Sequence, residues 1–419
     1  MNQKALLAVF SIALFSAALT SEVKAVSENN CLACHSRLMK KFSAPARLFA
    51  KDVHAGEGLI CSDCHGGNPA QTTWHGRKNP AQGFFGKPDP VEIPAFCNLC
   101  HGDAEYMKKF NPTLPVDQLV KYRTSRHGIL LLEKGDTKAA NCVSCHGVHD
   151  MRKVNDPAGS VYAVNLPLTC ARCHSDSSYM ATYGIPTNQY RDFASSVHGV
   201  ALLERGDLGA PACNDCHGNH GAIPPQVENI SQVCGLCHAN NAKLYRESFH
   251  ASIFETLGSP GCETCHGNHR IVHPEESFLG PGEKSVCVSC HQDSPPDSGF
   301  AVGLSMKSIL DSLAGSCDSV TALVDKAERI GMETSELRLL LRDVRQSLIE
   351  SRTMIHSFTT LEVRKTAAPG IGLALELRAG AVQLLAEHLK RRWWLGGLSL
   401  VLLALILGLY LKIREIETE

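Results

Sequence analysis

Residues 142–146 read Cys-Val-Ser-Cys-His, and the same Cys-x-x-Cys-His pattern occurs nine times between residues 31 and 291. The nine copies use eighteen of the nineteen cysteines in the 419-residue chain. Their cysteines are Cys31, Cys34, Cys61, Cys64, Cys97, Cys100, Cys142, Cys145, Cys170, Cys173, Cys213, Cys216, Cys234, Cys237, Cys262, Cys265, Cys287 and Cys290. Their closing histidines are His35, His65, His101, His146, His174, His217, His238, His266 and His291. One kind of chemical site is therefore repeated along the chain.

This pattern is the attachment signature of c-type haem. The two cysteines can form thioethers with the haem vinyl groups, and the adjacent histidine places its imidazole on the iron as the proximal ligand. A single copy would also fit half of a zinc site or part of a disulfide framework. Neither of those needs a histidine directly after the second cysteine. Nine copies predict nine covalently bound haem c groups.

The motif region is internally repeated. Residues 125–128 (Ser-Arg-His-Gly), the motif at Cys142 and residues 147–149 (Gly-Val-His) recur as residues 196–199, the motif at Cys213 and residues 218–220. A shorter version runs through residues 248–250, Cys262 and residues 267–269, and a looser one through residues 52–54, Cys61 and His75. Each unit adds a second motif, at Cys97, Cys170, Cys234 or Cys287. Four two-haem units therefore follow one N-terminal haem at Cys31.

Haem iron takes a second axial ligand, which must come from outside the motif. Nine further histidines precede residue 300, one for each haem, and eight of them fall at two repeated places in the units. They are His54, His75, His127, His149, His198, His220, His250, His269 and His273. Bis-histidine ligation closes the iron to substrate and leaves it suited to electron transfer. Met107, Met151 and Met180 are the alternative ligands, and the haems at Cys31 and Cys287 are the first candidates for an open site.

The haems must also supply much of the interior of this region. Nine haems over residues 31–291 leave about 29 residues for each, too few for separate protein cores. Aromatic residues are only 6% of the chain. We expect a mainly α fold with extensive irregular loops, built on packed haems within a domain of residues 26–295, then a helical stalk and one C-terminal transmembrane helix.

The two ends of the chain predict where it works. Residues 1–25 have the features of a secretory signal peptide: a lysine near the start, an apolar stretch and a cleavage site of small residues. Residues 393–411 contain no charged residue and are long enough to cross a bilayer, which leaves residues 412–419 as a cytoplasmic tail. We therefore expect a single-pass protein of the bacterial cytoplasmic membrane with its haem domain on the periplasmic side.

Residues 300–392 carry apolar residues at three- and four-residue steps, which predicts a helical hairpin or bundle. Residues 368–370 (Ala-Pro-Gly) are expected to break the chain before the last helix. The plainest role is a stalk, and docking of a membrane partner is the alternative. His356 and His388 are interpreted as surface or interfacial residues, with a haem or quinol role as the alternative, and the odd Cys317 as a buried apolar residue.

The charge balance argues against a nucleic-acid partner. The formal net charge is −1, and no stripe of Lys and Arg stands out. We expect redox proteins as partners, namely a quinol-oxidising membrane subunit and periplasmic cytochromes.

The nine motifs with their Gly-x-His elements resemble the multihaem c-type cytochromes of the bis-histidine kind, over residues 31–291. The resemblance implies electron transfer in anaerobic respiration, from quinol to periplasmic or extracellular acceptors. Some multihaem relatives are enzymes, such as nitrite reductases and hydroxylamine oxidoreductases, which keep one open haem. The nitrite reductases often have Cys-x-x-Cys-Lys at that haem, a pattern that this chain lacks. No catalytic residue is assigned.

Overall fold

The computed structural model describes residues 29–221, 227–292 and 298–418. The predicted signal peptide, residues 1–25, lies outside the described residues. Every regular element in the described part is helical, and none of it is a strand. The prediction of a mainly α fold with irregular loops is therefore confirmed.

The chain divides into two compact units. One comprises Met1–Thr169 with His220–Ala222, and the other comprises Cys170–Asn219 with Ile223–Glu419.

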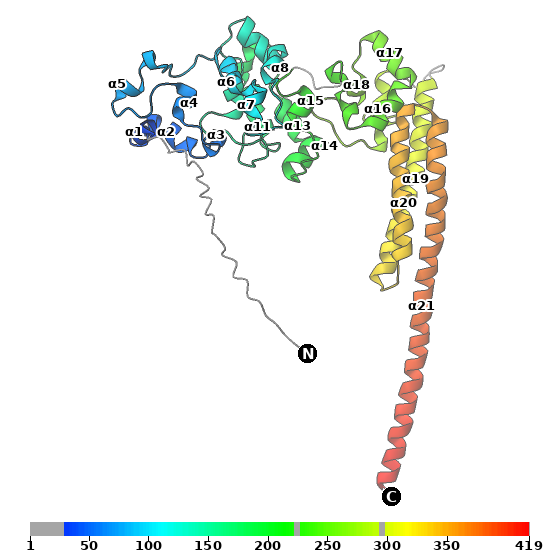
Figure 1. The fold of residues 1–419 in the computed structure, drawn as a ribbon. Helices are drawn as coiled ribbons and strands as arrows, with labels where there is room; N and C mark the ends of the chain where they lie inside the picture. Colours follow the sequence, from blue (N-terminus) through cyan, green and yellow to red (C-terminus); the bar gives the residue numbers. More distant parts are fainter. Residues whose placement is uncertain (1–28, 222–226, 293–297, 419) are drawn as a thin grey trace, which may run out of the picture. The chain divides into compact units, whose positions relative to one another are not determined.

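Most of the haem motifs lie on short helices, several of which are labelled in Figure 1, and each of these helices ends at the histidine of its motif. These helices are α1 (Asn30–His35), α4 (Cys61–His65), α6 (Ile93–His101), α10 (Cys142–His146), α11 (Leu166–His174), α15 (Cys213–His217) and α18 (Gly261–His266). The motifs at Cys234 and Cys287 begin on the 3₁₀ helices η5 (Ile230–Leu236) and η7 (Cys287–Ser289). Residues i, i+3 and i+4 share one face of a helix. Helical winding therefore places both cysteines and the histidine of a motif on one face of its helix, as attachment of a single haem would require.

Short elements and loops connect the motif helices. They are α2 (Lys40–Phe49), α3 (Val53–Gly56), α5 (Trp74–Arg77), η1 (Pro80–Gln82), α7 (Ala104–Met107), α8 (Gln118–Thr124), α9 (Arg126–Gly128), η2 (Ile129–Glu133), α12 (Ser177–Met180), η3 (Ala181–Tyr183), α13 (Gln189–Ala194), α14 (Val197–Gly199), η4 (Val200–Glu204), α16 (Ala239–Arg246), α17 (Phe249–Leu257) and η6 (Glu276–Phe278). The repeat predicted from sequence is visible here, because α9–η2 and α14–η4 are the same helical turn followed by a π-helical turn.

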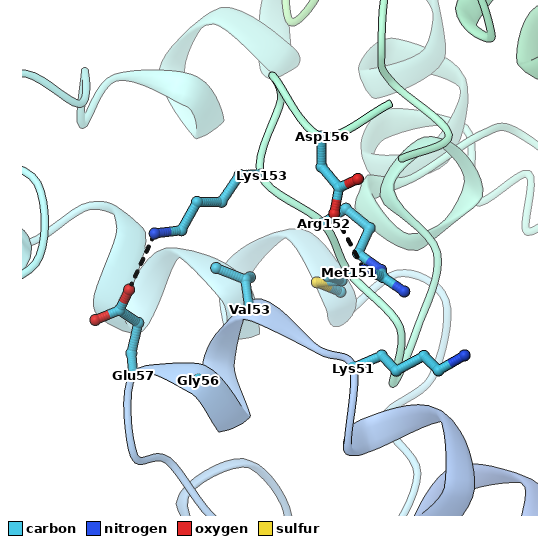
Figure 2. Close-up of a pocket in the computed structure, with 8 residues that line it drawn as sticks. All are labelled: Lys51, Val53, Gly56, Glu57, Met151, Arg152, Lys153 and Asp156. Carbon is cyan, nitrogen blue, oxygen red and sulfur yellow. Dashed lines mark hydrogen bonds and ion pairs between the residues drawn. The ribbon is translucent and has the colours of Figure 1, made fainter. Parts of the chain in front are cut away.

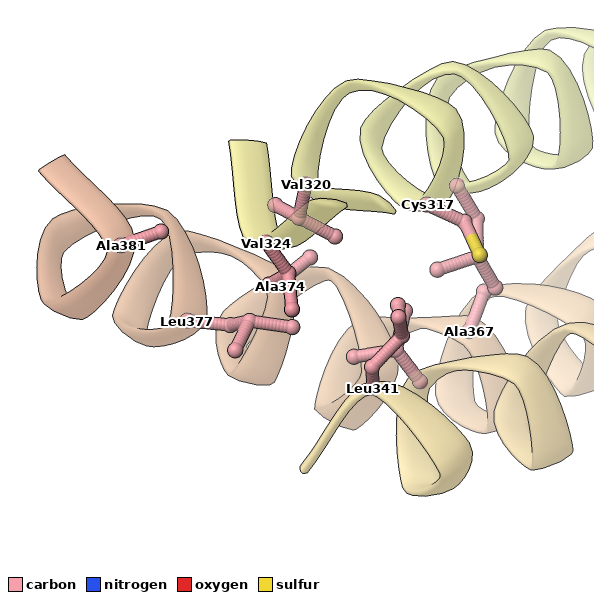
Figure 3. Close-up of a cluster of buried hydrophobic side chains, with 10 residues drawn as sticks. Cys317, Val320, Val324, Leu341, Ala367, Ala374, Leu377 and Ala381 are labelled. Atoms are coloured by element: carbon pink, nitrogen blue, oxygen red, sulfur yellow. The ribbon is translucent and has the colours of Figure 1, made fainter. Parts of the chain in front are cut away.

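Three long helices follow the motif region and pack side by side: α19 (Ser298–Arg329), α20 (Ser335–Met354) and α21 (Thr360–Thr418), with η8 (Ile355–Ser357) between the last two. Their shared core includes Val324, Leu341, Val344 and Leu377, none more than 1% exposed (Figure 3). Cys317 is 5% exposed in the same core. The predicted helical stalk is thus a three-helix bundle, and Cys317 is one of its apolar residues.

The predicted break at residues 368–370 is wrong. Pro369 lies inside α21, which runs without interruption from Thr360 to Thr418. Packing against α20 outweighs the proline penalty here: the Ser347 hydroxyl donates to the Thr366 carbonyl at 3.3 Å, and a Cβ on Gly370 would overlap the Ser347 side chain. The chain turns earlier, at Phe358, whose φ is 54°.

The C-terminal part of α21 leaves the bundle (Figure 1). Among the described residues, α21 is the one helix that is long and apolar enough to cross a membrane, judged by length and composition. Its apolar stretch is not buried, and Trp393 and Trp394 are 82% and 77% exposed. This stretch contains the membrane span predicted from the sequence.

Replacing Leu377 by Ala should destabilise the bundle by about 2–5 kcal/mol, because its fully buried side chain leaves a cavity among the three helices. Leu375, on the same helix, is 60% exposed, and Leu375→Ala is the matched control with an effect below about 1 kcal/mol. Thermal melting followed by circular dichroism measures both. Equal effects of the two substitutions would contradict the packing described here.

Candidate haem-binding site

The structure places a second imidazole opposite seven of the motif histidines, within the part of the chain that it describes. The facing pairs, with ring-centroid separations, are His101–His54 (6.0 Å), His65–His149 (5.9 Å), His146–His220 (6.1 Å), His238–His198 (6.2 Å), His217–His269 (5.9 Å), His291–His250 (6.0 Å) and His266–His356 (6.1 Å). Each pair lies within one of the two compact units of the fold. The narrow range of separations, 5.9–6.2 Å, shows that the pairs share one geometry.

That separation fits an iron atom held between two imidazoles. Two nitrogens about 2 Å from one metal ion, plus about 1 Å from each nitrogen to its ring centre, place the centroids about 6 Å apart. The interplanar angles range from 11° at His146–His220 to 84° at His54–His101. Rotation about the two iron–nitrogen bonds changes this angle and leaves the separation unchanged. The residues present therefore fit bis-histidine haem.

Hydrogen bonds favour, in two of the motif histidines, the tautomer that a metal ligand needs. The Nδ1 of His65 lies 2.6 Å from the Gly86 carbonyl oxygen, and the Nδ1 of His35 lies 3.0 Å from the Phe42 carbonyl oxygen. A carbonyl oxygen only accepts, so Nδ1 carries the proton and Nε2 keeps its lone pair. Metal-binding histidines commonly donate their second nitrogen in this way.

Burial also favours the neutral imidazole. It lowers the pKa of His101 and of His146, and in each case the facing histidine lowers that pKa further. A neutral ring is the form that binds a metal ion.

The Ser-x-His-Gly element aims its histidine by capping a short helix. The Ser196 hydroxyl accepts from the Gly199 backbone N–H at 3.0 Å, and the Ser125 hydroxyl accepts from Gly128 at 2.9 Å. A Cβ on Gly199 would overlap the Phe193 carbonyl oxygen. The serine is therefore an N-cap and the glycine allows a close backbone approach, which together fix the turn that carries His198.

Replacing Gly199 by Ala should move the α14 turn and pull His198 away from His238. We expect a partial high-spin ferric signal from one haem, measured by electron paramagnetic resonance (EPR) of the oxidised protein. Gly56→Ala is the control, because Gly56 follows the facing histidine His54 by two residues but a Cβ at Gly56 meets no atom within 4 Å. An unchanged low-spin spectrum in the Gly199 variant would contradict this role for the turn.

In the first two-haem repeat, Asp52 takes the place of the capping serine. Its Oδ1 accepts from the backbone N–H and from Nδ1 of His54, both at 2.9 Å, and its Oδ2 accepts from the Met151 N–H at 2.9 Å. The Val53 N–H donates to the Met151 carbonyl at 2.8 Å. Figure 2 shows the small pocket where these segments meet, with an ion pair between Lys153 and Glu57 at 3.4 Å. Residues 52–54 and 149–151 are thereby joined.

The facing pairs recur in the same order along the four two-haem units, the repeats of the sequence. The histidine before the first motif of a unit faces the second motif of the same unit, as at His54–His101, His198–His238 and His250–His291. The Gly-x-His histidine faces the first motif of the preceding unit, as at His149–His65, His220–His146 and His269–His217. Successive units thus share ligands, an arrangement that sequence order alone does not predict.

The remaining candidate histidines stand differently. His75 is exposed, with its ring 5.0 Å from Trp74, and among the described residues no second imidazole stacks on His35. His273 is exposed and makes no ring contact within the described part of the chain. His127 and His174 belong to the same two-haem repeat but to different compact units of the fold. His75 and His127 therefore stay predicted ligands.

His356 is the residue for which the sequence favours the less informative interpretation: a surface or interfacial position, with a haem or quinol role only as the alternative. In the structure it is half-buried and faces His266 with an interplanar angle of 28°. One signal could have found it, because the fourth unit has no successor to supply the facing histidine for its first motif. The haem at Cys287, a predicted candidate for an open site, has His250 facing its proximal histidine.

The attachment cysteines of consecutive motifs are neighbours within each unit. The thiols of Cys97 and Cys142 are hydrogen-bonded, which raises the pKa of Cys97, and Cys170 with Cys213 and Cys234 with Cys262 repeat this contact. Burial raises the pKa of Cys265 to about 11, and the nearby Cys287 and Cys290 add to the rise. Thioether sulfurs do not titrate, so these interactions serve here as a measure of proximity. Haems attached at these positions would lie next to one another.

The zinc alternative finds no support in the described residues, where no group of three or more His, Cys, Asp or Glu side chains could hold a metal ion. Paired imidazoles without further protein ligands suit a metal whose other positions a porphyrin fills.

Comparison with known proteins agrees with this geometry. A family model described as Cytochrome c3 matches residues 53–175, which contain four of the nine motifs. Searches of curated proteins and of solved structures found no match. Residues 53–175 are therefore similar to cytochrome c3, a likeness that agrees with the haem-attachment motifs and with the facing imidazole pairs.

Proposed function

We propose that this chain is a membrane-anchored, extracytoplasmic nonahaem cytochrome that carries electrons in an anaerobic-type respiratory chain. It would accept electrons from a quinol-oxidising membrane partner and pass them to periplasmic acceptors. The observation that carries this proposal is the set of facing histidine pairs, because iron with two imidazoles has no open position for a substrate.

The neighbouring attachment cysteines support conduction along the chain. Inside each compact unit, one motif lies near the next, because Cys100 raises the pKa of the Cys64 thiol and Cys237 raises that of the Cys216 thiol, in each case after the larger effect of burial. Inside each compact unit, haems that are consecutive in the sequence would therefore be neighbours in space, which is what stepwise electron transfer needs. Two histidine ligands also keep haem potentials low, compared with a His–Met pair.

The apolar part of α21 supports the anchored location, and the predicted signal peptide supports export. One span offers little room for a quinol pocket, so we assign quinol oxidation to a separate subunit.

The test compares native membranes with the purified chain. A water-soluble quinol should reduce the haems in membranes from cells that make the full chain, and added soluble cytochrome should reoxidise them. The purified chain in liposomes should accept electrons from a reduced dye but not from quinol alone. Direct reduction by quinol would overturn the separate partner, and haems that pass no electrons onward would overturn the carrier role.

One observation favours a second function. The described residues place no facing imidazole on His35, so the haem attached at Cys31 is the strongest candidate for an open iron. The alternative is an oxidoreductase for a small nitrogen or sulfur compound at that haem. Turnover of nitrite, hydroxylamine or tetrathionate with a reduced dye, measured against a haem-free control, would support it, and absence of turnover would favour the carrier.

A further inference from the structure

The junction between α20 and α21 enters the haem region of its own unit. His356 lies on η8 (Ile355–Ser357), and its ring is 6.1 Å from that of His266 with an interplanar angle of 28°. Phe358, two residues further on, has its ring 3.8 Å from that of His250. The bundle therefore contacts the ring groups of two haem sites, those of Cys262 and Cys287.

His356 carries the marks of the other facing histidines. Its Nδ1 lies 2.9 Å from the Thr353 carbonyl oxygen, so that nitrogen is the donor and Nε2 keeps its lone pair. His54 and His65 use their Nδ1 atoms in the same way, toward Asp52 and Gly86. The His356–His266 separation falls within the range of the other six pairs.

The sequence repeat supplies no facing histidine for His266. First-motif histidines face the Gly-x-His element of the following unit, but the fourth unit, with His266, is the last. In earlier units the residue two positions after that facing histidine also contacts the Ser-x-His or Asp-x-His element: Met151 contacts Val53 and Ile271 contacts Val197. Phe358 stands two positions after His356 and lies against His250 of the equivalent element. The α20–α21 junction thus takes the position of a fifth unit.

Side-chain contacts hold the junction in place. The Arg352 guanidinium Nε donates to the Glu276 carboxylate at 2.9 Å, which ties α20 to η6. Met354 and Ile355 pack on a second apolar cluster that joins Leu279 of the haem region to Leu310 of α19. The imidazole is therefore positioned by a packed bundle and not by a loose loop.

We propose that His356 is the distal iron ligand of the haem attached at Cys262 and Cys265, so that the membrane-proximal bundle completes the haem array. This inference rests on the proposed nonahaem electron carrier. It replaces His273 in the set of nine, since His273 is exposed and faces no motif histidine among the described residues. The bundle is then part of a redox site in addition to holding the haem domain near the membrane.

The test is EPR of the oxidised full chain in detergent, with haem content checked by mass. His356→Ala should retain nine haems but convert one of the nine from low-spin to high-spin, and added imidazole should restore the low-spin signal. His388→Ala, on α21 away from the junction, and His273→Ala should both leave the spectrum unchanged. A low-spin His356→Ala spectrum, or a new high-spin haem in His273→Ala, would overturn the assignment.

A second variant, which keeps an iron ligand at position 356, separates loss of the ligand from misfolding of the chain. His356→Met should keep the haem six-coordinate and shift one reduction step to higher potential, because Met in place of His raises haem potentials. A set of potentials identical to that of the native chain would overturn the assignment. High-spin haem in the native chain would instead count against the proposed function, so the two failures are distinguishable.

Discussion

A chain made without haem should lose its protected structure between residues 29 and 292 and keep the α19–α21 bundle. The reason lies in how little apolar protein the haem region buries. Its ten buried apolar side chains, prolines aside, are Ile93, Met107, Leu131, Ala139, Met180, Leu202, Ala212, Val233, Ala242 and Leu279, from the described residues 29–221 and 227–292. The bundle buries sixteen between Phe300 and Ala381. The haem region has no adequate core of its own.

Binding energy for a metal or cofactor site becomes folding energy when the site does not exist in the unfolded chain. Each of nine haems would add its own binding energy, and burial of its large apolar surface would stabilise the fold further. The bundle needs none of it except at His356. Removing haem therefore affects the two parts of the chain very differently.

The experiment replaces all eighteen motif cysteines by Ala in the full chain and follows amide hydrogen exchange in detergent. Residues 29–292 should exchange at rates close to those of an unfolded chain, while residues 300–354 stay protected. The native haem-bound chain is the control and should be protected in both parts. Retained protection across the motif region of the variant would show that the protein alone forms this fold.

Replacing His269 by Met should raise the reduction potential of one haem, that attached at Cys213, by on the order of 0.1 V or more, because axial ligands set haem potentials over a range of about 0.8 V. His269 faces His217 at 5.9 Å with an interplanar angle of 20°. A methionine thioether is also a haem-iron ligand, and it is a weaker donor to the ferric state. Redox titration followed by optical spectroscopy should show one haem of nine reduced early.

The matched control is three residues away. His273→Met changes the same residue type in the same loop, but His273 is exposed and faces no motif histidine within the described residues. Its titration should overlay that of the native protein. A shift in the control equal to that of His269→Met would contradict the ligand assignment drawn from the facing pairs.

The motif region and the bundle differ in what their sequences predict. The nine Cys-x-x-Cys-His copies predict the haem attachment sites directly, since each predicted site is local in the chain. The bundle follows from helical periodicity, and Leu341 and Val344 are buried as that periodicity predicts. The break predicted at Pro369 was wrong, because tertiary contacts between Ser347 and α21 override the local preference.

The pairing of imidazoles could be predicted only in part. The repeated positions identify which histidines matter, but each first-motif pair joins residues of two different two-haem repeats, such as His65 and His149. His356 resembles an ordinary histidine on an amphipathic helix, and only the fold brings it to His266. Local sequence therefore predicts the haem attachment, and tertiary structure decides the distal ligands.

The central claim is that all nine haems are closed by two histidines. Spin quantitation by EPR of the oxidised full-length protein tests it most directly. The predicted result is nine low-spin ferric haems per chain with no high-spin component. A high-spin signal equal to one haem or more would contradict the claim and indicate an open iron.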